Sequence, residues 1–292
     1  MHRYLKAIGF GNIISYNQIN ELLREVTSTF SHHERIALEP EADYLEYWKD
    51  FGPDIGIALC GIMDNYENFD KQYYFPYFRG KGESTRTDMI VDKRPDREAY
   101  VGICEDLKIG INLIFHLQNA TDYLKEDPKK NCFISAASVS LAGLCEQGTI
   151  LLPVKKNTEQ KKQQREEIHQ RIRLMNAARE GDQSAMESLT LDEIDTYSKV
   201  SMRLYDEDVF SIVDTYIMPY GVECDQYSVM GEILELSEGI NILTRELLYF
   251  MTIEVNDLLI DVCVPAGNLM GEPKIGRRFK GNLWLQGYLN LI

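Results

Sequence analysis

The densest basic segment in the C-terminal part of the chain runs from Lys274 to Gly281. Arg277, Arg278 and Lys280 follow one another closely there, and guanidinium groups suit the oxygens of a phosphate or carboxylate. Lys274, Arg277, Arg278 and Lys280 are therefore candidate anion-binding residues. The alternative is internal ion pairing, which is the commoner role of such residues in a chain with many acids. The candidate internal partners are Glu223, Asp225, Glu232 and Glu272.

Other residues with catalytic or metal-binding chemistry lack the spacing that such sites need. His32 and His33 are adjacent, so they point in different directions on a strand or a helix, which favours an ordinary surface pair over a metal site. His116 lies in an apolar run and is expected to be structural. The Gly9-Phe10-Gly11 segment has neither the third glycine nor the preceding strand of a nucleotide-binding loop. The sequence predicts no catalytic residue, no metal site and no cofactor.

An aromatic segment, Tyr73 to Phe78, permits two interpretations. It could form a stacking platform for a sugar or a base. An edge strand is the favoured interpretation, because alternate residues would fill a core and Pro76 would mark an edge or a bulge.

Composition excludes several classes of protein. The chain has 292 residues, 46 acids against 31 Lys and Arg, and a net charge of −15, which makes nucleic acid an unlikely partner because most of the surface would repel phosphates. Six cysteines occur without CxxC spacing, so neither a disulfide framework nor a zinc site is expected. The apolar runs are too short for a membrane span, and the first residues do not resemble a signal peptide. We expect a cytoplasmic protein that does not bind membranes.

Local patterns predict helices at the N-terminus and in the middle of the chain. Ser15 and Gln18 form a capping box, and a second helical stretch is expected from Pro40 to Gly52. Residues 155–179 carry eight Lys or Arg and an apolar stripe at helical spacing, and Gly181 is placed to end this helix. Residues 182–208 carry eight acids against two bases, with a further helix expected from the capping box of Thr190 and Glu193.

The two oppositely charged helices are expected to pair within one chain, as a charged connector. Charge alone cannot hold them, because an exposed ion pair contributes only about 0.2–1 kcal/mol. An apolar stripe on the first helix must therefore pack against the second helix or a β unit. The stripe is Ile168, Ile172 and Met175, and the expected partners are Leu191, Ile194 and Tyr197.

The remaining segments are short, rich in β-branched and aromatic residues, and separated by turn formers. Turns are expected at residues 237–239, 256–257 and 266–267. The predicted fold class is α+β, with two related antiparallel β-rich units, each a meander or small barrel, joined by a helical pair and preceded by an N-terminal helix. The predicted divisions are an N-terminal helical segment, a first β-rich unit, the charged connector and a second β-rich unit: residues 1–51, 52–154, 155–206 and 207–292.

Four landmarks recur in the same order in both halves and predict an internal duplication. Pro76 matches Pro219, the Arg97-Glu98 pair matches Arg245-Glu246, Leu113 matches Leu258, and Ala142-Gly143 matches Lys280-Gly281. The offsets are 143, 148, 145 and 138 residues. Residues 52–154 and 207–292 should then superpose as strands in the same order.

The stretches MPYGVECDQYSVMGEI and GEPKIGRRFKGNLWLQG resemble a family of conserved intracellular proteins from Gram-positive anaerobes. That family is classed as a domain of unknown function, numbered 3881. The resemblance covers essentially the whole chain and implies a bacterial, cytoplasmic setting. It implies no activity, cofactor or catalytic residue.

The leading functional hypothesis is a non-catalytic binding or scaffold protein, because the chain combines a duplicated architecture with no convergent His, Cys or Ser constellation. The alternative is an enzyme or sensor that holds a small anionic ligand between the units, near Arg277 and Arg278. The partner is thus either a protein or a small anionic ligand, and the sequence leaves the oligomeric state open.

Overall fold

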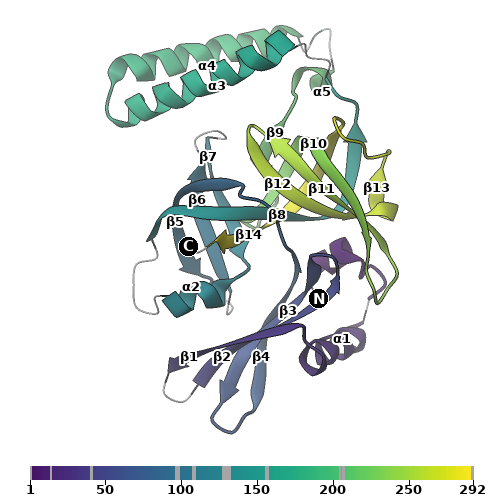
Figure 1. The fold of residues 1–292 in the computed structure, drawn as a ribbon. Helices are drawn as coiled ribbons and strands as arrows, with labels where there is room; N and C mark the ends of the chain where they lie inside the picture. Colours follow the sequence, from purple (N-terminus) through teal and green to yellow (C-terminus); the bar gives the residue numbers. More distant parts are fainter. Residues whose placement is uncertain are drawn as a thin grey trace.

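A computed structural model describes residues 2–13, 15–39, 42–95, 99–106, 110–126, 133–154, 158–203, 205 and 208–290. Its elements form two sheets, with helices at the N-terminus and in the middle of the chain (Figure 1). The fold class is therefore α+β, as the sequence predicted. Arg97, Glu98 and Cys132 lie outside the described residues.

The N-terminal part combines two helices with a four-stranded antiparallel sheet. A 3-10 helix, η1 (Arg3–Ile8), precedes α1 (Tyr16–Ser28), and the predicted capping box between Ser15 and Gln18 is present. Four buried residues at helical spacing anchor α1: Ile19, Leu22, Leu23 and Val26. The sheet has the order β1-β2-β3-β4. Its strands are β1 (His32–Glu39), β2 (Ala42–Gly52), β3 (Ile55–Asp64) and β4 (Phe69–Phe78).

The helix predicted after Pro40 is therefore wrong within the described residues, because residues 42–52 form β2. Tyr44, Trp48 and their neighbours pair with β1 on one side and β3 on the other. These pairings with the preceding and following strands bury large aromatic side chains, and they outweigh the local helix signal.

The larger sheet has ten strands in the described residues, and its first half is an antiparallel meander. After the meander and the short helix α2, the long strand β8 returns to pair with β5. These elements are β5 (Thr85–Lys93), β6 (Tyr100–Asp106), β7 (Ile111–Leu117), α2 (Ala120–Glu126) and β8 (Phe133–Leu151).

The second half follows the same scheme. A meander, β10-β11-β12, is followed by a short helix and by the long strand β14, which returns to pair with β10. A short strand, β9, pairs with β10, and another, β13, pairs with β8. The elements are β9 (Tyr216–Pro219), β10 (Gln226–Ile240), β11 (Leu247–Val255), β12 (Leu258–Pro265), η2 (Ala266–Asn268), β13 (Leu269–Met270) and β14 (Arg278–Asn290).

Neither half closes by itself, because the long strands are shared. β8 and β14 pair antiparallel to each other, β14 also pairs parallel to β7, and β8 also pairs parallel to β12. One closed ring thus contains β5, β6, β7, β14 and β8, and the other contains β10, β11, β12, β8 and β14. Side chains from both halves form one core, among them Phe115, Val139, Ile260 and Leu283. The two β units are one interlocked double barrel.

Two glycines let the ring of Phe115 fill this core. Gly102 on β6 pairs with Phe115 on β7, and Gly287 on β14 pairs with Leu117 on the other side of β7. A Cβ atom at either glycine would lie 2.3 Å from a ring carbon of Phe115. Any side chain there would displace the ring, so these positions need glycine.

The two halves have the same strand order, but the segments that correspond in the structure are not the predicted ones. Leu113 on β7 and Leu258 on β12 both lie on the third strand of a meander. Pro76 lies on β4 in the four-stranded sheet, whereas Pro219 lies on β9 at the edge of the larger sheet. The corresponding segments begin at β5 and β10, because β3 and β4 belong to the other sheet.

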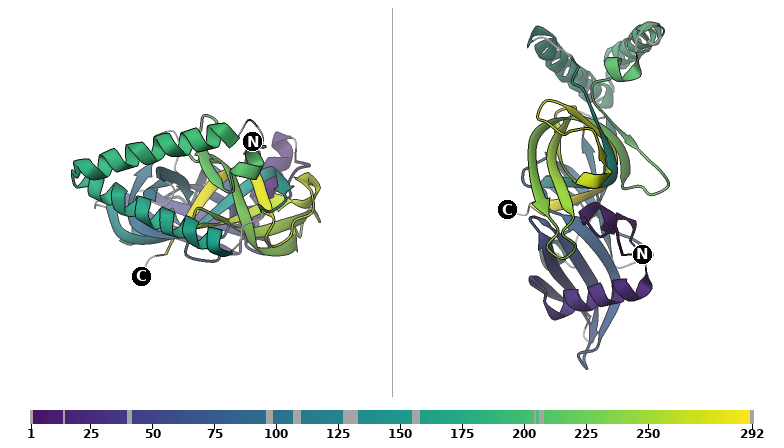
Figure 2. Two further views of the ribbon diagram at one scale, coloured as in Figure 1. Left: turned by 90° about the horizontal axis from the view of Figure 1, so that it is seen from above. Right: turned by 90° about the vertical axis from the view of Figure 1, so that its right-hand side faces the viewer.

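The connector is a helical hairpin of α3 (Thr158–Arg179) and α4 (Gln183–Arg203), followed by α5 (Val209–Ile212). Gly181 ends α3 with a φ of 94°, as predicted. α4 begins earlier than the predicted Thr190, because the Asp182 carboxylate accepts hydrogen bonds from the backbone of Ser184 and Ala185. The hairpin lies at one end of the elongated molecule, and the four-stranded sheet lies at the other (Figures 1 and 2).

The predicted packing of the hairpin is only partly correct. Ile172 and Met175 on α3 are half-buried, but Leu191 and Ile194 on α4 are exposed and do not cover them. The side chains of Ile168 and Tyr197 lie outside those described.

Candidate functional site

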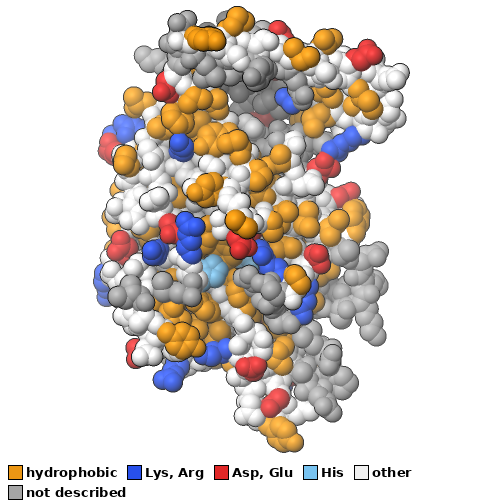
Figure 3. Space-filling model, turned by 180° about the vertical axis from the view of Figure 1, so that it is seen from behind, with side chains coloured by type: hydrophobic (Ala, Val, Ile, Leu, Met, Phe, Trp, Pro, Cys, Tyr) orange, Lys and Arg blue, Asp and Glu red, His pale blue; other side chains and the backbone are white. Residues whose placement is uncertain are grey.

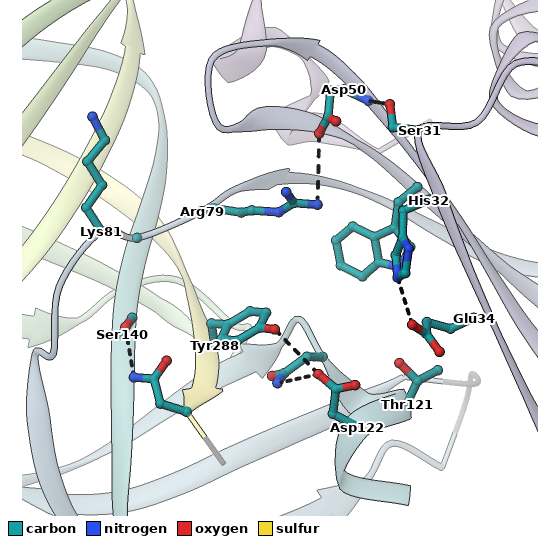
Figure 4. Close-up of a pocket in the computed structure, with 14 residues that line it drawn as sticks. Ser31, His32, Glu34, Asp50, Arg79, Lys81, Thr121, Asp122, Ser140 and Tyr288 are labelled. Carbon is teal, nitrogen blue, oxygen red and sulfur yellow. Dashed lines mark hydrogen bonds and ion pairs between the residues drawn. The ribbon is translucent and has the colours of Figure 1, made fainter. Parts of the chain in front are cut away.

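A cleft of about 670 Å³ lies between the four-stranded sheet and the first barrel (Figure 4). Its walls come from β1, β2, the segment that joins β4 to β5, the start of α2, β8 and β14. The lining residues are Ser31, His32, Glu34, Trp48, Asp50, Arg79, Gly80, Lys81, Asn119, Thr121, Asp122, Ser140, Tyr288 and Asn290. A volume of this size suits a small molecule.

A buried amide network fixes the segment that carries Arg79. Gln286 on β14 accepts a hydrogen bond from the backbone N–H of Phe78 (3.2 Å) and donates to the carbonyl of Pro76 (2.7 Å). Gln118 donates to the carbonyl of Phe78 (2.8 Å). Further along, the backbone N–H of Lys81 donates to Asp261 on β12 (2.7 Å). The end of β4 and the following residues are thereby attached to both barrels.

Arg79 lies over aromatic rings at the centre of one wall. Its guanidinium carbon is 5.7 Å from the ring centroid of Trp48 and 5.1 Å from that of Tyr77. The Asp50 carboxylate is 3.9 Å from the Arg79 Nη2 atom and accepts a hydrogen bond from the Tyr77 hydroxyl. Gly56 makes room for this tyrosine, since a Cβ there would lie 2.3 Å from the Tyr77 hydroxyl oxygen. The guanidinium is therefore positioned by stacking and keeps most of its donors available to the cleft.

The carboxylates on the opposite side of the cleft are already engaged. Glu34 lies 2.8 Å from His32 and forms an ion pair with Lys125. Burial alone would raise the pKa of Glu34, but hydrogen bonding and charge from Lys125 and His32 outweigh it and hold the pKa below its usual value. Adjacent to His32, His33 instead contacts the rings of Phe30 and Tyr47, as expected for neighbours on a strand.

The start of α2 is locked onto β14. The Asn119 side chain donates to the carbonyl of Leu289 (2.8 Å) and to Asp122 (3.1 Å), and it accepts from the backbone N–H of Leu289 (2.9 Å). The hydroxyl of Tyr288 lies 3.4 Å from the same Asp122 carboxylate. These contacts hold an amide, a carboxylate and a phenol at one edge of the cleft (Figure 4).

A fully buried carboxyl group lies directly behind the cleft wall. Glu46 is 1% exposed and accepts hydrogen bonds from the Tyr44 hydroxyl (3.0 Å), the Trp48 indole (3.2 Å) and the Thr121 hydroxyl (3.2 Å). Trp48 and Thr121 both line the cleft. Burial raises the pKa of Glu46 to about 7, against the lowering effect of these hydrogen bonds. The charge behind this wall therefore changes near neutral pH.

The four residues predicted to bind an anion have different surroundings in the structure. Arg278 is 5% exposed and donates to four backbone carbonyls, those of Leu152 (3.0 Å), Val213 (2.9 Å), Asp214 (3.4 Å) and Phe210 (2.8 Å). Leu152 follows β8, and the other three belong to α5 or follow it. Arg278 thus ties both ends of the helical connector to β14, and its donors are committed.

The other three basic residues lie on the surface. Arg277 donates to the carbonyl of Glu272 (2.6 Å), and its guanidinium is 3.8 Å from the Glu272 carboxylate. Lys274 forms a 2.9 Å ion pair with the same carboxylate. Lys280 lies 4.2 Å from the ring centroid of Phe210. Glu272 is one of the internal partners considered from sequence, and anion binding by these residues stays an untested prediction.

Sequence reasoning missed the cleft residues. Arg79, Gly80 and Lys81 form a short basic, glycine-containing stretch directly after the aromatic segment, and this was the one local signal available. The aromatic segment itself forms β4, an edge strand of the four-stranded sheet, which is the structural interpretation favoured from sequence. His116 is buried against Phe75 and Trp284, with ring centroids 4.3 and 5.1 Å away.

Within the described residues, no group of three or more His, Cys, Asp or Glu side chains is arranged to hold a metal ion. No described helix is long and apolar enough to cross a membrane.

Comparison with known proteins gives a family but no activity. No curated protein and no solved structure matches the chain. A family model described as "Domain of unknown function, E. rectale Gene description (DUF3881)" matches residues 5–287. This match spans nearly the whole sequence, and the chain belongs to the DUF3881 family.

Proposed function

We propose that this protein is a non-catalytic binding protein that holds a small polar ligand with a carboxylate or phosphate group in the cleft beside Arg79. The observation that carries the proposal is the convergence of sequence-distant segments on one cavity of about 670 Å³. Of its 14 lining residues, Trp48 and Gly80 alone lack a charged, hydroxyl, amide or imidazole side chain. Such a lining favours a polar ligand over an apolar one.

The class of ligand follows from the groups in the cleft that are still able to form hydrogen bonds. Glu34 and Asp122 accept from neighbouring side chains, and Asp50 accepts from Tyr77. The Arg79 guanidinium, in contrast, lies 3.9 Å from the Asp50 carboxylate, and the Lys81 ammonium lies 3.7 Å from the Asp54 carboxylate, so both of these side-chain contacts are long. A guanidinium with this geometry suits the paired oxygens of an anionic group.

The remaining lining suits the rest of such a ligand. Tyr288 supplies a hydroxyl group across the cleft from Arg79 (Figure 4), and Asn119 and Asn290 are lining residues with amide side chains. These groups match hydroxyl or amine substituents on a small metabolite. The proposal thus keeps the small anionic ligand considered from sequence, but it moves the anchor from Arg277 and Arg278 to Arg79 and Lys81.

A ligand screen on the purified full chain tests this proposal. The probes are sugar phosphates, nucleotides and dicarboxylates in a thermal-shift assay, followed by calorimetric titration of the best compounds. Arg79→Gln should weaken binding at least about 10-fold, since a charge-assisted hydrogen bond contributes roughly 1.5–3 kcal/mol. The matched control is Arg86→Gln, which removes an exposed arginine that pairs with Glu83 outside the cleft.

Two results would contradict the proposal. One is a screen in which none of these anionic compounds raises the melting temperature. The other is a ligand that binds the Arg79→Gln and Arg86→Gln variants equally well, since its site would then lie elsewhere.

The matching strand orders of the two halves support an origin by internal duplication, with the long strands β8 and β14 exchanged between the copies. The family resemblance and the composition support a bacterial, cytoplasmic location.

A further inference from the structure

The buried carboxyl group of Glu46 touches residues from two elements that line the cleft. Tyr44, Glu46 and Trp48 alternate along β2, so their side chains share one face of the strand, and all three are buried. Glu46 accepts a hydrogen bond from the Trp48 indole of the four-stranded sheet (3.2 Å) and another from the Thr121 hydroxyl of α2 (3.2 Å). Because Trp48 and Thr121 both line the cleft, a charge on Glu46 lies directly behind its lining.

The surroundings of Glu46 disfavour its charged form. Its described hydrogen-bond partners are Trp48, Thr121, the Tyr44 hydroxyl (3.0 Å) and the Cys60 thiol (4.0 Å), and none of these side chains can carry a positive charge. Burial removes the water that would otherwise stabilise a carboxylate. The neutral acid is accommodated, since the hydroxyls of Tyr44 and Thr121 accept hydrogen bonds as well as donate them. Both protonation states therefore fit the folded protein.

Three neighbouring elements each place a titratable group near Glu46. Glu34 of β1 and Cys60 of β3 lie opposite it in the sheet register, and Asp122 lies on α2. Glu34 has a lowered pKa and pairs with His32, so it stays ionised near neutral pH. The charge of Asp122 adds to the effect of burial and raises the pKa of Glu46 further, to about 7. Neither acidic neighbour supplies the positive charge that would keep Glu46 ionised.

Trp48 places Glu46 close to the cation of the cleft. Its indole N–H contacts Glu46, and the Arg79 guanidinium carbon lies 5.7 Å from its ring centroid. The Glu46 carboxyl and the Arg79 guanidinium are therefore no more than about 12 Å apart. Two unit charges at roughly that distance interact by the equivalent of about a 10-fold change in affinity, at an effective dielectric constant of about 20. A negative charge on Glu46 thus attracts Arg79 and repels an anion bound beside it.

We propose that anion binding beside Arg79 is coupled to protonation of Glu46, so that the cleft binds its ligand more tightly when Glu46 is neutral. This coupling rests on the anion-binding function proposed above and adds its regulation by pH. Linkage is reciprocal, so a bound anion strengthens proton binding to Glu46 by the same factor. As pH rises through about 7, Glu46 loses its proton and the affinity for the anion falls.

Calorimetric titration of sulfate into the full chain tests the coupling. It is carried out at about pH 6 and about pH 8 and at constant ionic strength, on either side of the titration of Glu46. Sulfate does not change its charge in this range, so any pH dependence belongs to the protein. Between these values the wild-type affinity should fall about 2- to 5-fold more than that of Glu46→Gln, which keeps the side-chain size but cannot ionise.

Two controls separate Glu46 from other charged groups. His32 also lines the cleft, and a histidine side chain can change charge in the same range of pH. The comparison is therefore repeated between His32→Gln and His32→Gln/Glu46→Gln, where the same difference should remain. Figure 3 shows further Lys and Arg side chains on the face of the molecule seen from behind, where sulfate can also bind. Arg79→Gln measures that background.

A second measurement needs no change at Glu46. In the His32→Gln variant at about pH 7, the heat of sulfate binding is compared between two buffers with different ionisation enthalpies. The comparison should show net proton uptake on binding. Circular dichroism and thermal melting check that all variants are folded.

The outcomes distinguish the coupling from the function on which it rests. The coupling alone is overturned if sulfate binding depends on Arg79 but wild type and Glu46→Gln lose affinity equally between the two pH values, or if no proton is taken up. If sulfate does not bind the wild type, or binds Arg79→Gln equally well, the proposed function and the coupling both fail.

Discussion

The double barrel and the helical hairpin use the same residue types with opposite consequences. Leu283 on β14 is fully buried in a core built by both halves of the chain, whereas Leu191 on α4 is 67% exposed. The barrel therefore holds most of the apolar surface that folding removes from water. The described side chains of the hairpin make few such contacts. Apolar burial is therefore concentrated away from the hairpin end of the molecule.

The largest expected effect comes from testing this contrast with matched leucines. Leu283→Ala should lower the free energy of unfolding by about 2–5 kcal/mol, because it leaves a cavity in a core that cannot collapse around it. Leu191→Ala should change it by less than about 0.5 kcal/mol at a concentration where the chain is monomeric. Urea denaturation of both variants measures the difference. Similar losses from the two would mean that the hairpin is part of the folded core.

The second prediction concerns Glu46, whose pKa is raised by burial to about 7. Between its ordinary pKa of 4.5 and this value, the folded state binds a proton that the unfolded state has released. The free energy of unfolding should therefore fall as pH rises through this window, by up to about 3 kcal/mol from this group.

Glu46→Gln should remove that contribution, so the variant gains stability relative to wild type as pH rises from 4.5 to 7. Denaturation curves at several pH values measure it. Glu34→Gln is the control for sign, because the pKa of Glu34 is lowered and its contribution is lost as pH falls. If the difference in the free energy of unfolding between the wild type and Glu46→Gln does not vary with pH, Glu46 is not buried as described.

The third prediction separates the two adjacent arginines at the start of β14. Arg278→Ala should cost about 1–3 kcal/mol, because it leaves the half-buried carbonyls of Val213 and Phe210 without this donor. Arg277→Ala removes a surface contact to Glu272 and should cost less than about 1 kcal/mol. Urea denaturation measures both. Equal, small losses would show that Arg278 does not anchor the connector.

The smallest expected effect lies within the hairpin itself. Ile172 on α3 is half-buried, so Ile172→Asp should destabilise the protein by about 1 kcal/mol, whereas Arg171→Ala on the exposed side should cost less than about 0.5 kcal/mol. Thermal melting of the two variants measures the difference. Small and equal changes would mean that α3 is not packed against the rest of the chain.

Sequence reasoning succeeded where a short stretch of chain decides the structure. The capping box of Ser15 and Gln18, the end of α3 at Gly181 and the turn at Asn256-Asp257 all follow from hydrogen bonds or φ angles within a few residues. The turn predicted at Ser237–Gly239 is wrong, because β10 continues through it to Ile240. Gly239 there makes room for the ring of Phe250 on the neighbouring strand rather than reversing the chain.

The cleft could not have been predicted in the same way. Trp48, Arg79, Asp122 and Tyr288 are separated by up to 240 positions, and no spacing rule relates them. They meet because β14 crosses between the two halves and because the four-stranded sheet packs against the barrel.

By itself, the sequence determined the α+β class, the main strands and the two charged helices, since periodicity, capping and turn chemistry act between near neighbours. Its motifs also determined the family. The tertiary structure decided which strands pair, and therefore the pairing of β8 with β14, the burial of Arg278 and Glu46, and the exposure of Leu191 and Ile194. The physical reason is that a strand's own pattern fixes which face is apolar but not which partner covers it. That choice depends on how side chains of the whole chain fill one core.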